Sequence, residues 1–178
     1  MNRRLFLKAS GFAGIGLASV GGYNWLTTAE NKAPLTIDAA VTTLNDILKL
    51  DSIKTHGNWT AHQVFNHIAQ SIEYSMTGYP QHKSDIFKST VGSAAFSVFS
   101  SKGYMKHNLS EWIPGEPIIS DHGNTMMAVM RAKQAFVDFA QFEGPLQPHF
   151  AYGPLSKREY EAAHVMHLYN HMEELLWG

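Results

Sequence analysis

Apolar residues recur at helical spacing in four long segments of the chain, and no segment shows the convincing alternation that marks a half-buried strand. The four predicted helices run from about Thr36 to Lys49, Thr60 to Met76, Asn124 to Phe142 and Ser156 to Leu176. A shorter helix is expected around Ala94–Phe99, on a long connection. This pattern predicts an all-α protein, folded as a four-helix bundle.

Two of the predicted helices begin with a capping box, in which a hydroxyl residue is followed three positions later by Glu or Gln. Thr60 is paired in this way with Gln63, and Ser156 with Glu159. Glycine and proline indicate connecting loops at Ile113–Pro117, Gly144–Pro145 and Pro148–Pro154. No repeat or linker divides the chain further, so one domain is expected over residues 30–178.

The first 29 residues have the pattern of an export signal. No charge occurs between residues 9 and 29, and glycines make this stretch only weakly apolar. The segment resembles a twin-arginine signal, whose motif residues here are Arg3, Arg4, Phe6, Leu7 and Lys8. We therefore expect export by the twin-arginine machinery to the periplasm or another extracytoplasmic site. An uncleaved segment would instead tether the protein to the membrane.

The composition narrows the chemistry that the chain can perform. It has no cysteine, which excludes disulfides, thiolate metal sites and a cysteine nucleophile, but it has 10 histidines. Lys and Arg number 14 against 15 Asp and Glu, so the net charge is −1. Without a basic surplus, nucleic-acid binding is not expected. Imidazole and carboxylate groups must carry any metal or acid–base chemistry.

Histidines form a stripe on the last predicted helix. Spacings of four and three residues place one set of side chains on the same face: Tyr160, His164, His167, His171 and Glu174. This face flanks the apolar one. Histidines at i and i+4 stand about 6 Å apart along a helix axis, so their rings can converge on one ion.

A third ligand must come from another helix. On the second predicted helix, His67 shares a stripe with Ser71 and Tyr74. His67 would form a three-histidine site with the i,i+4 pair His167 and His171, or with His164 and His167 at i and i+3. Such a site keeps an open coordination position, as in catalytic metal sites. His164 is a candidate fourth ligand or supporting group, and a packed polar network without metal is the alternative.

The remaining six histidines fall in predicted loops or near helix ends, and we expect them at the surface. Among them, His149 lies just before the last helix and could approach the cleft.

The pattern of histidines on two predicted helices resembles that of the DinB-like superfamily of four-helix metalloenzymes. The resemblance is carried by Asn58-Trp59-Thr60 before a helix with His67, and by His167-x-x-x-His171 on a late helix. The segments 58–79 and 150–171 resemble an uncharacterised, exported branch of the superfamily. The resemblance extends over residues 36–177.

The resemblance implies an up-down-down-up bundle and a divalent metal, with zinc, nickel or iron as the typical ions. It also implies that His67, His167 and His171 are the ligands. Characterised relatives include transferases that use low-molecular-weight thiols, which are cytoplasmic and fit poorly with export. Many relatives have two successive histidines in the last helix, whereas Asn170 precedes His171 here.

Three functions follow from these observations. The first is a metal-dependent hydrolase or transferase that acts on a small-molecule substrate, with Ser71, Tyr74 and Glu174 as supporting groups. The second is a non-enzymatic, exported metal-binding or stress-related module with a closed coordination shell. The third is a scaffold with a polar core. A homodimer through Trp112 and Phe96–Phe99 is an alternative to their packing in the core.

Overall fold

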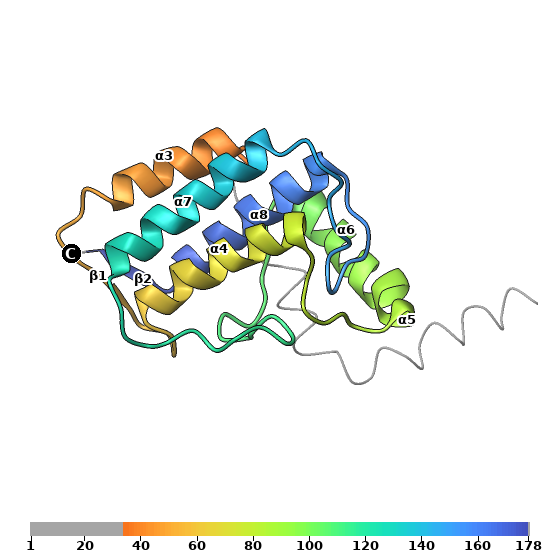
Figure 1. The fold of residues 1–178 in the computed structure, drawn as a ribbon, viewed down its shortest axis with the longest axis horizontal. Helices are drawn as coiled ribbons and strands as arrows, with labels where there is room; N and C mark the ends of the chain where they lie inside the picture. Colours follow the sequence, from red (N-terminus) through yellow and green to blue (C-terminus); the bar gives the residue numbers. More distant parts are fainter. Residues whose placement is uncertain (1–33, 178) are drawn as a thin grey trace, which may run out of the picture. The chain divides into compact units, whose positions relative to one another are not determined.

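The computed structural model describes residues 34–177, so the export motif at residues 2–8 lies outside the described part. The elements, in chain order, are α3 (Ile37–Ile47), β1 (Ile53–Thr55), α4 (Ala61–Thr77), α5 (Asp85–Phe87), the π-helix η1 (Lys88–Gly92), α6 (Ser93–Lys102), α7 (Thr125–Gln141), α8 (Lys157–Met172) and β2 (Leu175–Trp177). The described part is therefore mostly helical, as predicted (Figure 1). None of its helices has the length and apolar character needed to cross a membrane.

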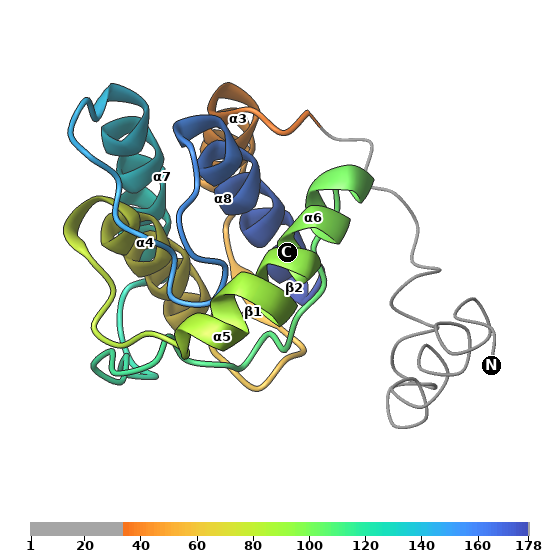
Figure 2. The same ribbon diagram turned by 90° about the vertical axis from the view of Figure 1, so that its right-hand side faces the viewer.

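Helices α3, α4, α7 and α8 surround one apolar core (Figures 1 and 2). Helix α7 packs against α4 and α3, and α8 packs against the same two helices. The starts of α4 and α7 lie together, where His62 Nδ1 is 3.4 Å from the Asn124 carbonyl oxygen. The starts of α3 and α8 also lie together, because the Ile37 N–H donates to Glu161 Oε1 over 3.1 Å.

Both predicted capping boxes are present, and they fix the starts of the two helices that carry the histidines. The Thr60 side chain accepts from the Gln63 N–H, and the Gln63 side chain accepts from the Thr60 N–H. Ser156 and Glu159 form the same reciprocal pair. Each box satisfies two backbone donors that the first turn of a helix leaves free.

The prediction that the last helix continues to about Leu176 is wrong. Helix α8 ends at Met172, and Leu175–Trp177 pairs with Ile53–Thr55 as an antiparallel two-stranded sheet. Ile53 lies opposite Trp177, and Thr55 lies opposite Leu175. Strands of three residues are too short to show an alternating pattern, so neither strand was predicted from the sequence.

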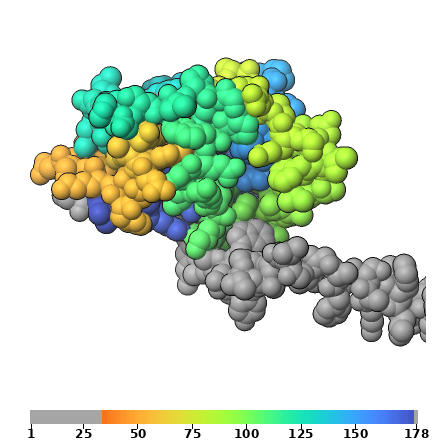
Figure 3. Space-filling model, turned by 90° about the horizontal axis from the view of Figure 1, so that it is seen from below, coloured from red at the N-terminus to blue at the C-terminus, as the bar shows by residue number. Residues whose placement is uncertain are grey.

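The connection between α4 and α7 holds a helical run, α5–η1–α6, that packs beside α8 (Figure 2). Phe96 and Phe99 are buried in it, which supports their assignment to the interior rather than to an interface. At Gly92, any Cβ would overlap the backbone carbonyl of Ala151, so glycine allows close contact with the loop before α8. Figure 3 shows the chain after α6, in green, next to this run in yellow-green.

Candidate metal centre

The structure brings together the three histidines that are predicted from the sequence to be ligands. Helix α4 supplies His67, and α8 supplies His167 and His171. Each ring has one nitrogen atom that lies within 4.8 Å of one nitrogen atom in each of the other two rings. All three residues are buried. The ring centroids are 4.7 to 5.2 Å apart. Since the stripe on α8 faces α4, residues far apart in sequence form one cluster of imidazoles.

Glu174 orients the ring of His171. The His171 Nδ1 atom lies 3.1 Å from Glu174 Oε1, and the carboxylate accepts its proton. The His171 Nε2 atom therefore carries a lone pair, and it lies 3.1 Å from His167 Nε2. At Gly57, a Cβ would overlap the Glu174 carboxylate, so the absence of a side chain leaves room for it. A carboxylate behind a histidine is the usual support for a metal ligand.

A second carboxylate, Glu116, lies behind His67. Its Oε1 atom accepts the Ile113 N–H over 2.9 Å and lies 3.6 Å from His67 Nδ1, beyond hydrogen-bond length. Both His67 Nδ1 and Glu116 Oε2 are buried without a hydrogen-bond partner. Unpaired buried polar atoms are rare and call for an explanation, such as an absent ion. The sequence placed Glu116 only in a loop, and no motif marked it.

A fourth imidazole, His107, approaches the cluster from the chain after α6. Its ring centroid lies 5.0 Å from that of His167 and 5.4 Å from that of His171. Its Nδ1 atom is buried without a partner. Asn170, the residue before His171, holds this segment because its Oδ1 accepts the His107 N–H over 3.1 Å. The expectation that His107 is a surface residue is wrong, since irregular chain gives no periodic signal of burial.

Burial keeps His107, His167 and His171 uncharged. It lowers the pKa of His107 to about 4, and it holds the pKa values of His167 and His171 well below the ordinary value. Neighbouring histidines lower all three further, because adjacent imidazoles resist acquiring like charges. Burial also raises the pKa of Glu174, against a smaller effect of His56. Neutral imidazole is the form that binds a metal.

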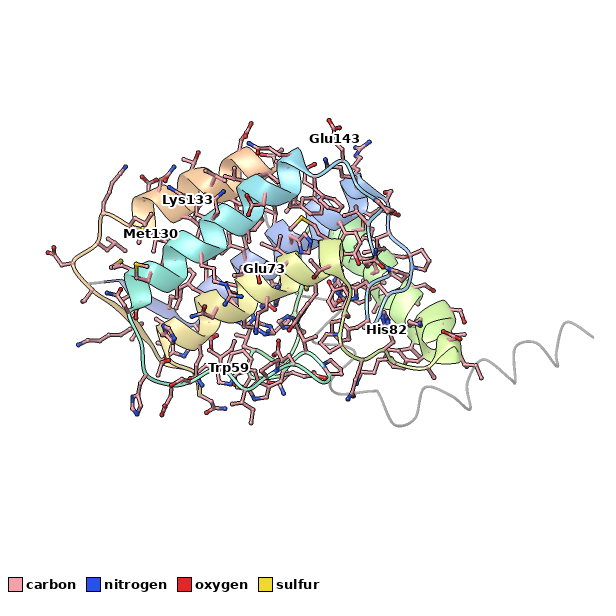
Figure 4. All side chains as sticks on the ribbon, in the orientation of Figure 1. Trp59, Glu73, His82, Met130, Lys133 and Glu143 are labelled. Carbon is pink, nitrogen blue, oxygen red and sulfur yellow. The ribbon has the colours of Figure 1, made fainter. Side chains whose placement is uncertain are left out.

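Tryptophan closes one side of the cluster. The Trp59 ring stacks with His171 at a centroid distance of 6.2 Å and meets His67 edge-on at 5.0 Å. Trp112 covers Trp59 at 4.2 Å. Trp59 lies at the start of α4, as the labelled side chain in Figure 4 shows. These rings place the imidazoles in a weakly polar environment, which strengthens electrostatic interactions.

On another side, His67 and His167 border a cavity of about 230 Å³. Ser71 and His164 also line it, whereas Tyr74 packs against Tyr79 at 5.8 Å. His164 stands outside the three-histidine cluster, because its Nε2 atom is hydrogen-bonded to Ser75 Oγ over 3.1 Å. The cavity allows a small molecule to reach the cluster.

The other histidines divide into two groups. His56, His82 and His122 are exposed, as expected. His62 is half-buried, and His149 is buried in the wall of the cavity, so for these two the expectation of a surface position is wrong. Their surroundings come from the loops that pack on them, which a single sequence does not reveal.

Comparison with known protein families gives one match. The family described as a protein of unknown function, DUF1569, matches residues 29–176, and the chain belongs to it. A search of the curated proteins finds no match, and a search of the solved structures finds none.

Proposed function

We propose that this member of the family binds one divalent metal ion through His67, His167 and His171 and acts as a metal-dependent hydrolase or transferase. The observation that carries this proposal is the convergence of three buried imidazoles from two helices. Ligand nitrogens around a tetrahedral ion, at 2.0–2.1 Å from it, lie about 3.3 Å apart. The distance of 3.1 Å between the Nε2 atoms of His167 and His171 is close to that value.

We further propose that the chain has the up-down-down-up topology of the DinB-like superfamily. Two sets of contacts support this. The starts of α4 and α7 meet, and so do the starts of α3 and α8. The strands that follow α3 and α8 are paired, so these two helices also end together. The resemblance of the segments around His67 and His171 points to the same superfamily.

An ion in the cluster would supply Lewis acidity, or a water or substrate group made more acidic by coordination. The chain's own residues would hold it and shape access to it. Glu174 fixes the tautomer of His171, and Trp59 shields the cluster from water. The cavity beside His67 and His167 provides the approach for a small substrate.

One observation favours a second function. The ring of His107 lies close enough to His167 that a modest movement would bring a fourth imidazole to the ion. Four protein ligands are typical of structural rather than catalytic zinc sites. A closed shell of this kind would make the protein a non-enzymatic metal-binding module. The coordination number, measured by X-ray absorption on the metal-loaded protein, separates the two functions.

Metal analysis tests the common part of both functions. The untagged protein is loaded with zinc or nickel, dialysed and analysed for bound metal. We expect about one equivalent in the natural protein, and a loss of at least half of it in His171→Asn. The matched control, His122→Asn, changes an exposed histidine and should retain the metal. Protein that binds neither ion at micromolar concentration would refute the proposal.

We also propose export by the twin-arginine route. The paired Arg3 and Arg4 followed by an uncharged, glycine-rich stretch support it, as does the lack of cysteine in a domain that would be exported folded. Replacement of both arginines by lysine should retain the protein in the cytoplasm, as measured by cell fractionation. An unchanged periplasmic fraction would contradict this route.

A further inference from the structure

Two buried histidines outside the three-histidine cluster line the same cavity. His149 precedes α8 and His164 lies within it. The ring of Tyr160 lies near both residues: it stacks on His164 at a centroid distance of 5.2 Å and lies 6.1 Å from His149. The proposed metal site assigns neither of them a role.

The hydrogen bonds of His149 fix its tautomer. Its Nδ1 atom accepts two backbone N–H groups, from Ala151 at 3.1 Å and from Tyr152 at 3.2 Å. Backbone N–H groups only donate, so Nδ1 must carry the lone pair. Burial holds the pKa of His149 well below its ordinary value, and the ring is therefore neutral. Its proton is on Nε2, which has no hydrogen-bond partner among residues 34–177 and remains a free donor.

The hydrogen bonds of His164 fix the opposite tautomer. The Ser75 hydroxyl donates its single proton to the Ile72 carbonyl oxygen over 2.6 Å. It can then only accept from His164 Nε2, at 3.1 Å. Burial lowers the pKa of His164 to about 3, so this ring is also neutral. Its Nδ1 atom carries a lone pair that no donor in the described part of the chain satisfies.

His149 and His164 both line the cavity, and their fixed tautomers give one donor and one acceptor, neither of which carries a charge. We propose that the cavity binds a small uncharged molecule with two polar atoms, one that accepts from His149 Nε2–H and one that donates to His164 Nδ1, as the oxygen and nitrogen of a primary amide do. A carboxylate would face the lone pair of His164, and an ammonium or amidinium group would face the N–H of His149. Each would bury an unpaired polar atom.

The rest of the cavity wall fits the apolar body of such a molecule. Trp112, Phe150 and Tyr152 contribute aromatic surface. The two charged side chains, Lys83 and Glu111, have opposite signs and are exposed, so they give no net preference for an ion. A dry cavity of about 150 Å³ can hold benzene. A volume of about 230 Å³ therefore suits one ring with one polar substituent.

This inference names the ligand class of the cavity beside the proposed metal site, and only the ligand's role as a substrate rests on the proposed function. The nitrogens of His149 and His164 do not belong to the three-histidine cluster. Binding can therefore be measured with zinc and after its removal. Binding of the amide without zinc binding refutes the metal proposal alone, and zinc binding without a preference for the amide refutes this inference alone.

Three near-isosteric probes provide the test: benzamide, benzoate and benzamidine, titrated at pH 7.5 and followed by the fluorescence of Trp112 in the cavity wall. We expect benzamide to bind at least tenfold more tightly than either ion, because each ion leaves one histidine nitrogen unpaired. Equal or tighter binding of benzoate or benzamidine, or no binding of benzamide at millimolar concentration, would overturn the inference.

A substitution at His164 tests whether this residue causes the preference for benzamide. His164→Phe keeps a ring between Phe139 and Tyr160 but removes the acceptor. It should raise the Kd of benzamide about three- to tenfold, while the exposed control His122→Phe leaves it unchanged. Nitrogen NMR of the natural protein gives a readout that needs no variant. Benzamide should shift the signals of His149 Nε2 and His164 Nδ1, and the opposite tautomers at these rings would contradict the proposal.

Discussion

His164 should make the stability of the metal-free protein depend on pH. The residue is 3% exposed, and burial lowers its pKa to about 3 from an ordinary value near 6.5. A group whose pKa is lower in the folded state gains protons on unfolding when the pH is acidic. Its contribution to stability is therefore complete above pH 6.5 and is lost as the pH falls towards 3.

The size of the effect follows from these two pKa values. One pH unit corresponds to about 1.36 kcal/mol per proton. At pH 4.5 the unfolded chain protonates His164 almost fully and the folded chain hardly at all. The free energy of unfolding therefore falls by about 2.7 kcal/mol between pH 7.5 and 4.5 through this residue alone. The value is insensitive to the folded pKa as long as that pKa lies well below 4.5.

Urea unfolding of the metal-free natural protein and of His164→Phe, at pH 7.5 and 4.5, measures this difference. At pH 7.5 the two proteins should agree within about 1 kcal/mol, because Phe fills the same space and removes one hydrogen bond. At pH 4.5 the variant should have lost about 2.7 kcal/mol less than the natural protein. His122→Phe, at an exposed site, is the control. Equal losses in the natural protein and His164→Phe would show that His164 is not buried in its neutral form.

Three further predictions concern the metal and the packing around it. Glu174→Gln should weaken zinc binding about 10- to 100-fold in a chelator competition assay, because it alters the hydrogen bond that orients His171; the exposed Glu173→Gln should not. Gly92→Ala should destabilise the protein by about 1–3 kcal/mol in urea, because the new methyl group meets a backbone carbonyl, and Gly144→Ala should cost less, because it meets only the Phe142 side chain. Zinc at 100 times its Kd should add about 2.7 kcal/mol to the free energy of unfolding, and an unchanged midpoint would exclude specific binding to the folded state.

Helical periodicity predicted the part of the site that lies on helices. Residues at spacings of three and four share a face whatever the rest of the chain does, so His167 and His171 were placed together correctly. Glu174 was placed on the same stripe, although α8 ends at Met172. Glu174 stays on the histidine face because its N–H donates to the His171 carbonyl oxygen, which adds a turn after the end of the helix.

Residues in irregular segments were not predictable in the same way. His107, Glu116 and His149 have contacts that depend on where their loops lie across the helices. Asn170 illustrates the difficulty, because its side chain accepts a hydrogen bond from the backbone N–H of His107. This contact joins residues 63 positions apart, and no local pattern in one sequence encodes it.

The carboxylates beside the cluster give a second argument for a divalent ion. The carboxylates of Glu116 and Glu174 are both buried, and among residues 34–177 neither forms an ion pair with lysine or arginine. Glu174 instead faces His171, whose pKa is held low by burial and by neighbouring imidazoles, and Glu116 lies 3.6 Å from His67 Nδ1. A buried carboxylate that ionises without a cation beside it is costly. A doubly charged ion among His67, His167 and His171 would balance both carboxylates, whereas a monovalent ion would leave one uncompensated. Glu174, which orients His171, and Glu116, which lies beside His67, would thus favour a dication through their charge.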